Sequence, residues 1–397
     1  MTAHIIAARR SAVCPRGGAF ARLSIVGLGV PVLLACLADA GLAPDQVDEV
    51  IVSNALGAGG NPARLVALAA GLPERVAGLT MDRQCAGGLD AVLLARALVE
   101  SGAAEVVVAG GVESYSRRPL RLATDPDGGP PVAYDRPAFT PWPDQDPDMH
   151  VAAAALATRL GIGRDRQDAL AVASHAKAMA AQRAMAAEIV VLEGQVGDAF
   201  TRPLTPALAG RARVLSGSVT TATTAVAADA AAFVVVVSDR IAQRAIRGMR
   251  ILAGVTRGAR PEEPGLAPAV AIAETLTKAH LSSRNLNVAE VMEAYAVQAI
   301  ACVEGARLDP GIVNLSGGAL ARGHPIGASG AILVVRLFHQ VPGGIGLAAI
   351  AAAGGIGTAL LVDKQDGQFA HFLRRATTAN RGASARQPPS RPPRCRP

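Results

Sequence analysis

The sequence predicts an α/β fold in which parallel strands alternate with crossover helices and the chain forms two similar halves. Helix-type and strand-type patterns alternate along the chain, which is typical of such folds. Hydrophobic residues make up 50% of the sequence but aromatic residues only 3%, so Ala, Val, Leu and Ile must build a closely stacked core. Two predicted strands, 105–111 and 348–355, end in similar glycine turns, which indicates two halves of one topology.

The elements follow in order. Residues 30–40 have a helix pattern despite Pro31, and residues 48–53 have the pattern of the following strand. Residues 117–225 differ in character: 125–148 are irregular and rich in Pro and Asp, and 149–191 are helical with Ala-rich faces. From its composition alone, this segment is a solvated helical insertion.

Composition and cysteine spacing restrict the class of protein. The length of 397 residues suffices for two or three domains, and no apolar run reaches the roughly 18 to 20 residues that span a bilayer. The cysteines at 14, 36, 85, 302 and 395 show neither CxxC spacing nor a disulfide framework. A reducing, cytoplasmic location is therefore expected, without a metal site or a membrane span.

The formal charge of +7 does not indicate nucleic-acid binding. Residues 367–397 contain seven Arg and no Lys, Asp or Glu, so the whole excess belongs to this segment. We expect residues 365–397 to be a disordered basic tail, rich in Pro, Ser and Arg. The tail is either a tether to anionic surfaces or a readthrough or frameshift remnant.

Cys85 is the first candidate site residue. It lies between a hydrophobic stretch and a small-residue turn that leads into an apolar helix pattern. A thiol at such an elbow feels the positive end of the helix dipole, which predicts a lowered thiol pKa and a nucleophilic thiolate. The alternative is a buried structural cysteine.

His324 is the second candidate. It stands before Pro325 in a glycine-rich run over residues 317–330, and therefore on a tight loop. It is either a solvated loop residue or the base that activates the thiol of Cys85. Neither candidate lies in a phosphate-binding loop, because the sequence contains no GxxxxGK[ST] motif.

Together these segments resemble the thiolase family of acyl-CoA C-acyltransferases, over residues from about 4 to 364. The matching segments are 7–10, 60–64, the Cys85 elbow, 106–114, 293–296, the loop around His324 and 354–357. The resemblance implies a thiolase-like fold with mixed sheets, covering helices and an inserted loop domain. In that family the loop domain covers the substrate, which is the alternative to a solvated helical insertion. The implied domains are 1–117 with 226–247, the insertion 118–225, and a C-terminal half 248–364.

The resemblance also implies ligands and assembly. A coenzyme A thioester is the expected substrate, with no permanently bound cofactor, in lipid metabolism. Residues expected to contact coenzyme A are Met149, Ala225, Ala353 and Gly354, and Arg213 is a candidate for its phosphates. The backbone N–H groups of Cys85 and Ala353 are expected to form an oxyanion hole. A homodimer or homotetramer is expected, with residues 61–64 at a subunit contact.

The sequence departs from the family pattern at three places. Ala351 stands where thiolases have a second catalytic cysteine, Met292 stands where they have an asparagine that holds an oxyanion-hole water, and residues 220–225 lack the usual Asn and Ser. The resemblance therefore implies an acyltransferase that carries the acyl group on Cys85, with classical thiolysis in doubt. Two alternatives remain: transfer to another acceptor in a specialised pathway, or a catalytically silent assembly subunit.

Overall fold

A long mixed sheet forms the centre of the molecule. The computed structural model describes residues 1–57 and 59–364, so the predicted tail at 365–397 lies outside the described residues. The strand order is β13-β14-β15-β12-β1-β11-β5-β3-β4. These strands are β1 (Ala3–Ser11), β3 (Glu49–Ser53), β4 (Leu79–Met81), β5 (Val106–Glu113), β11 (Ala228–Ser238), β12 (Met249–Gly258), β13 (Leu286–Val291), β14 (Gly344–Ala352) and β15 (Ile356–Lys364). Short strands β2 (Cys14–Pro15) and β8 (Ile189–Val190) pair with β11 and β1.

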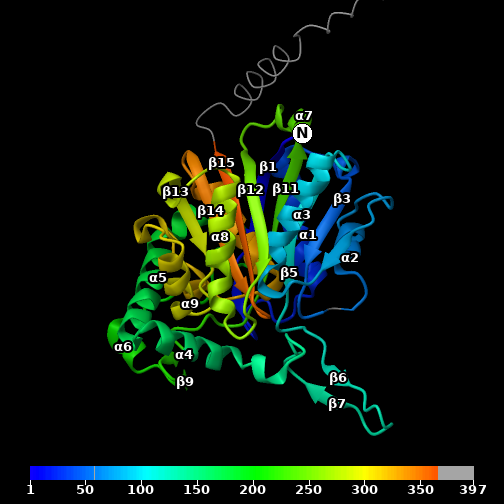
Figure 1. The fold of residues 1–397 in the computed structure, drawn as a ribbon. Coiled ribbons are helices and arrows are strands. Elements are labelled where there is room, and N and C mark those ends of the chain that lie inside the picture. Colours follow the sequence, from blue (N-terminus) through cyan, green and yellow to red (C-terminus); the bar gives the residue numbers. More distant parts are fainter. Residues whose placement is uncertain (58, 365–397) are drawn as a thin grey trace, which may run out of the picture.

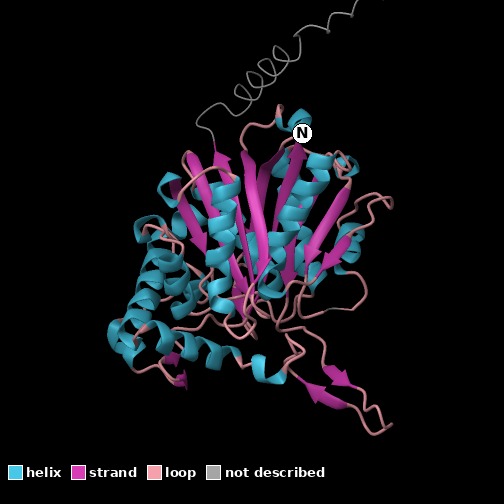
Figure 2. Ribbon diagram, in the orientation of Figure 1, coloured by secondary structure: helices cyan, strands magenta, loops and turns pink. Residues whose placement is uncertain are grey.

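Helices cover both faces of this sheet (Figures 1 and 2). The helices are α1 (Ile25–Ala40), α2 (Pro62–Ala69), α3 (Gly87–Ser101), α4 (Met149–Leu160), α5 (Arg164–Met185), α6 (Pro206–Gly210), α7 (Asp239–Ala242), α8 (Ala267–Lys278), α9 (Ala296–Gly305), α10 (Ala319–Arg322) and α11 (Ile326–Gln340). Among the described residues, no helix combines the length and the apolar character that a bilayer crossing needs.

Alternation along the strands assigns each face to a different set of helices. Val234 and Val236 of β11 belong to one core with α3 and α11, whereas Val235 and Val237 belong to another with α1 and α2. Successive side chains of a strand point to opposite faces, so both faces of β11 are buried. Near the other end of the sheet, β13, β14 and β15 pack against α8 and α9.

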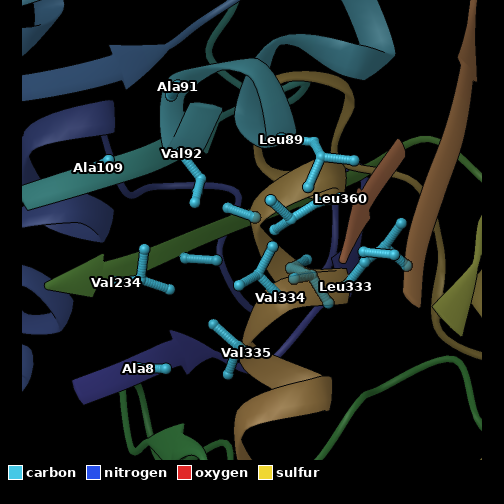
Figure 3. Close-up of a cluster of buried hydrophobic side chains, with 14 of the residues drawn as sticks. Ala8, Leu89, Ala91, Val92, Ala109, Val234, Leu333, Val334, Val335 and Leu360 are labelled. Carbon is cyan, nitrogen blue, oxygen red and sulfur yellow. The ribbon is translucent and has the colours of Figure 1, made fainter. Parts of the chain in front are cut away.

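The core around α3 and α11 joins the two halves of the chain. It contains residues of β1, β5 and β11 from the first half and of β12, β14 and β15 from the second, and Figure 3 shows Val334 and Leu333 of α11 among them. All residues of α11 from Gly327 to Phe338 are buried. Strand β1 also pairs with β12, so one sheet runs through both halves.

Glycines allow α3 and α11 to approach backbone to backbone. A Cβ on Gly88 would lie 2.7 Å from the Gly327 oxygen, and a Cβ on Gly330 would lie 2.3 Å from the Leu89 nitrogen. Both distances are shorter than any normal carbon contact. The first turns of the two helices can therefore meet only where side chains are absent.

The sheet is mixed, as the thiolase resemblance implies, and not parallel throughout, as the alternation of strand and helix patterns alone suggested. In the main strand order only the pairs β3–β4, β3–β5 and β13–β14 are parallel. The predicted glycine turn after residue 109 is wrong, since β5 continues through Gly110 and Gly111 to Glu113. Because these glycines have no side chain, the neighbouring backbone can lie close to them: a Cβ on Gly110 would lie 2.0 Å from the Ala232 oxygen. The turn after β14 does exist, with positive φ at Gly354 and Gly355.

The predicted helices are present, but they begin and end at other residues than predicted. Helix α1 begins before residue 30, because Ser24 caps it by accepting a hydrogen bond from the Gly27 nitrogen. The helical stretch predicted over 149–191 is α4 and α5, separated at Gly161. In the same region β6 (Arg121–Ala123) and β7 (Val132–Tyr134) form a hairpin that extends away from the sheet, and β9 (Val214–Ser216) pairs with β10 (Val219–Thr220) (Figure 1).

We expect Gly330→Ala to cost about 1 to 3 kcal/mol of unfolding free energy, because the added methyl group must push Leu89 and α3 away. Chemical denaturation measures the change. Gly27→Ala is the matched control, since its Cβ would make only ordinary contacts of 3.6 Å or longer and should leave stability unchanged or raise it slightly. Equal stabilities for the two variants would contradict the close helix contact.

Candidate active site

Cys85 lies in the 3-10 turn η2 (Gln84–Ala86), between β4 and the first turn of α3. Gln84 has φ 48°, an unusual conformation for a residue with a side chain, and its N–H donates to Asp82 Oδ1 at 2.7 Å. A Cβ on Gly87 would lie 2.1 Å from Ser53 Oγ, so the chain after Cys85 passes tightly against β3. Cys85 therefore lies at the positive end of α3, as its elbow position predicts.

His324 lies on the loop between α10 and α11. Gly323 has φ 110°, and the His324 N–H donates to the Val226 oxygen at 2.8 Å. Only glycine readily adopts this φ, and a Cβ at 323 would also lie 3.0 Å from Ala228 Cβ. The hydrogen bond to Val226 therefore fixes the loop, and with it the backbone of His324, against the segment before β11.

The two candidates are hydrogen-bonded to each other. His324 Nε2 lies 3.0 Å from Cys85 Sγ, and His324 Nδ1 lies 2.6 Å from Ser329 Oγ. The Ser329 hydroxyl donates its proton to the Pro325 oxygen at 2.9 Å, so it accepts from Nδ1–H. Nε2 then carries the free lone pair, and the thiol of Cys85 donates to it.

The ionisation state differs from the sequence-based expectation of a lowered thiol pKa. Burial raises the pKa of Cys85 to about 12, against the lowering effect of nearby backbone N–H groups. Burial, with the Arg322 charge, also lowers the pKa of His324 to about 4. A dry site disfavours both charges. The empty site therefore holds a neutral thiol and a neutral imidazole, and the thiolate forms only when His324 takes the proton.

Backbone donors surround the sulfur. The N–H groups of Cys85 and Ala353 both interact with Cys85 Sγ and lower its pKa. Ala353 belongs to the turn between β14 and β15, so the two donors come from opposite halves of the chain. Two convergent N–H groups beside a nucleophile can stabilise an oxyanion that forms there.

Two buried glutamates hold the loops of the site. Glu113 accepts hydrogen bonds from the N–H groups of Ala55 and Gly327, at 2.9 and 3.0 Å, and joins the end of β3 to the start of α11. Glu293 accepts from Asn314 Nδ2 and Ser174 Oγ, both at 2.7 Å. Both residues belong to segments that carry the thiolase resemblance, and their contacts here are structural.

A cavity of about 460 Å³ opens at the cysteine. Of the residues predicted to contact coenzyme A, Met149, Ala225 and Ala353 line it, and Gly354 lies in the adjoining turn. Ala351 lines the cavity as well. Met292, 1% exposed, belongs to the core of α3 and α11, and Arg213 is exposed.

Three polar side chains of the cavity were not singled out from the sequence. Tyr115, His150 and Tyr295 line it together with Cys85 and His324. Tyr295 and His150 are 145 positions apart in sequence, so no local spacing relates them. The one available signal was that Tyr115 directly follows the run 106–114 and that Tyr295 lies within the run 293–296, both of which carry the thiolase resemblance. Within the described part of the chain, no group of three His, Cys, Asp or Glu residues could hold a metal ion.

Comparisons with known proteins identify the family of the chain. The sequence patterns of the thiolase N-terminal domain and the thiolase C-terminal domain match residues 3–240 and 248–364. A putative acetyl-CoA C-acetyltransferase, YhfS of Bacillus subtilis, is 40% identical over 334 residues, which cover 80% of this chain and 88% of that protein. An acetyl-CoA acetyltransferase of Cupriavidus necator is 36% identical over 390 residues, 91% of this chain and 99% of its own.

Solved structures show the same similarity. The acetyl-CoA acetyltransferase of Bacillus anthracis superposes with a TM-score of 0.84 at 31% identity and covers 91% of this chain and 98% of its own. The Acat5 thiolase of Ascaris suum, in complex with coenzyme A, superposes with a TM-score of 0.85 at 28% identity and covers 92% and 100%.

We expect His324→Ala to slow alkylation of Cys85 by iodoacetamide at pH 7 by about 10²-fold or more, because no group then accepts the thiol proton. The wild-type rate should change little between about pH 6 and 10, since both partners stay neutral there. In the variant the rate should rise steadily with pH toward a thiol pKa near 12. Peptide mapping separates Cys85 from Cys14, Cys36 and Cys302, which serve as internal references. An unchanged rate and pH profile would contradict activation by His324.

Proposed function

The chain belongs to the thiolase family of CoA-dependent acyltransferases, and on this premise we propose that Cys85 carries the acyl group as a thioester. The observation that supports this most directly is the 3.0 Å contact between Cys85 Sγ and His324 Nε2. A nucleophile within hydrogen-bond reach of an oriented base is the arrangement that covalent acyl transfer requires.

The first half-reaction follows from this geometry. The Cys85 sulfur attacks the thioester carbonyl while its proton moves to His324 Nε2, and the backbone N–H groups of Cys85 and Ala353 donate to the carbonyl oxygen as it becomes negative. The C–S bond to coenzyme A then breaks, and the leaving sulfur takes the proton from His324. One such backbone donor typically contributes about 10² to 10³ in rate.

We propose that the same cavity receives the pantetheine arm of the substrate, beside Met149, Ala225, Ala353 and Gly354. Thr224 Oγ1 and Gln298 Nε2 support this role. Both atoms are buried without a hydrogen-bond partner in the described part of the chain, and both residues line the cavity. Amide groups of a bound substrate would satisfy them, which recovers the free energy that an unpaired buried polar atom costs.

The second half-reaction depends on position 351. We propose that Ala351 replaces the family's second catalytic cysteine, since it lies on β14 two residues before the Ala353 N–H and lines the cavity. A methyl group neither removes nor delivers a proton. Loss of a positioned acid or base costs about 10² to 10⁴ in rate unless another group takes over, so classical thiolysis should be slower than with a thiol at this position.

Assembly and location complete the proposal: a homodimer or homotetramer in the cytoplasm. Leu65 and Leu68 on α2 and Leu79 on β4 are large exposed hydrophobic residues, at 46%, 44% and 42% exposure. Strand β4 ends the sheet, so its outer edge is open to a second chain. These features lie beside residues 61–64, where the subunit contact is expected.

Incubation with acetyl-CoA should add one acetyl mass to the intact protein, and peptide mapping should place it on the peptide that contains Cys85. Cys85→Ser is the control and should show no stable thioester that hydroxylamine releases. Labelling at Cys14, Cys36 or Cys302 would contradict the assignment of Cys85 as the acyl carrier. No labelling of the wild type would favour the interpretation as a catalytically silent assembly subunit.

Ala351→Cys should raise thiolysis of acetoacetyl-CoA by at least tenfold, because it restores a thiol at the position proposed for proton transfer. The added sulfur should cost no more than about 1 to 3 kcal/mol of stability. Ala351→Ser is the matched control, since it places a hydroxyl of similar size at the same position but not the more acidic thiol. If Ala351→Cys cleaves acetoacetyl-CoA no faster than the wild type, position 351 does not have the proposed role in proton transfer.

A further inference from the structure

A second hydrogen-bonded pair lies in the cavity, formed by Tyr295 and His150. The Tyr295 hydroxyl lies 3.0 Å from His150 Nδ1. The two rings also meet edge to face, with centroids 5.7 Å apart and an interplanar angle of 83°. Both residues line the cavity with Cys85 and Ala351. The first half-reaction described above uses neither of them.

Two separate parts of the fold hold this pair. Tyr295 is the N-cap of α9 and makes a bridge to Thr224, next to the Ala225 N–H that donates to the Ala294 oxygen at 3.0 Å. His150 lies in the first turn of α4, where its N–H donates to Asp148 Oδ1 at 2.8 Å. The backbone therefore fixes both side chains at the cavity wall before a substrate binds.

The chemistry of the pair favours a proton donor over a base. Burial, followed by the charges of Asp148 and ionised Cys85, raises the pKa of Tyr295 above its ordinary value. The hydroxyl therefore keeps its proton at neutral pH. When His150 donates Nδ1–H to the phenol oxygen, the hydroxyl proton is free to point into the cavity, and the same N–H stabilises the phenolate after the proton has left.

We propose that Tyr295, positioned by His150, donates the proton that the departing carbanion takes up when a 3-oxoacyl-CoA is cleaved, in place of the sulfur that Ala351 lacks. This inference rests on the proposed function, because the acyl group must first be carried by Cys85. What it adds is the residue that supplies the proton in the cleavage direction.

The step balances in protons and electrons. The thiol proton of Cys85 moves to His324, and the sulfur adds to the 3-keto carbon. The bond between C2 and C3 then breaks, its electron pair stays on C2, and C2 takes the Tyr295 proton to give acetyl-CoA. His150 passes its Nδ1 proton to the phenolate while Nε2 takes one from water, and exchange with water then returns His150 to its Nδ1–H tautomer. His324 releases its extra proton to water. Free coenzyme A finally gives its thiol proton through His324 to Cys85 and accepts the acyl group.

Tyr115 is the competing donor. It lines the same cavity, and burial followed by the charge of ionised Cys85 raises its pKa as well. In the described part of the chain its hydroxyl makes no hydrogen bond, and the Arg118 guanidinium lies 5.9 Å from its ring centroid. Without a histidine partner, nothing returns a proton to Tyr115. The chain has three tyrosines, so the third, exposed Tyr134 on β7, provides a neutral control.

The test compares cleavage with acylation in the three Tyr→Phe variants. The probes are acetoacetyl-CoA and 3-oxooctanoyl-CoA with free coenzyme A for cleavage, and acetyl-CoA for acylation of Cys85. Tyr295→Phe should lose about 10² to 10⁴ in cleavage rate and still acylate Cys85. Tyr115→Phe should lose less than tenfold, and Tyr134→Phe should match the wild type. Adding Ala351→Cys to Tyr295→Phe should restore at least tenfold, because a thiol again supplies the proton.

Each failure is distinguishable. A wild type that does not acylate Cys85 overturns the proposed function. A wild type that acylates Cys85 but cleaves neither probe overturns this inference, and so does a Tyr295→Phe variant that cleaves at the wild-type rate. His150→Ala should be slow and should regain part of its rate with added imidazole, a response that a structural role would not give. Absence of that recovery would remove His150 from the relay.

Discussion

The first turns of α3 and α11 touch backbone to backbone at Gly88, Gly327 and Gly330, and this contact sets where the chemistry can occur. Cys85 lies two residues before the start of α3, and His324 lies two residues before the start of α11. Because the helices meet at their N-terminal ends, the thiol and the imidazole meet as well, at 3.0 Å. Both helices are in the core shared by the two halves of the sheet, so the packing that stabilises the fold also brings together the proposed nucleophile and its proposed base.

Burial at this contact decides how the nucleophile works. A thiol with a pKa near 12 beside an imidazole with a pKa near 4 does not exist as an ion pair in the empty site. The helix dipole and the two backbone donors oppose this effect but do not overcome it. The charged state is therefore reached only as the sulfur attacks, when the same backbone N–H groups can turn to the new oxyanion.

Features that depend only on short segments of the chain could be predicted from the sequence. The elbow of Cys85, the tight loop of His324 and the alternation of strands and helices are properties of short segments, and the structure has them. The state of the thiol could not be predicted, because it depends on how deeply distant segments bury it. Gly110 and Gly111 suggested a turn, but they lie within β5. The Ala232 and Gly327 oxygens approach them so closely that no Cβ would fit there. The Tyr295–His150 pair arises only because α4 of the insertion packs against α9.

The central claim is that one cavity holds the acyl carrier and the proton donor on either side of the bond that breaks. A crystal structure of the Cys85→Ser variant with acetoacetyl-CoA tests it most directly. We expect the 3-keto carbon about 3 to 3.5 Å from the residue 85 side-chain oxygen, the keto oxygen at the N–H groups of residues 85 and 353, and C2 facing the Tyr295 hydroxyl. A thioester bound with C2 turned away from Tyr295, or outside the cavity lined by Met149 and Ala351, would contradict the account.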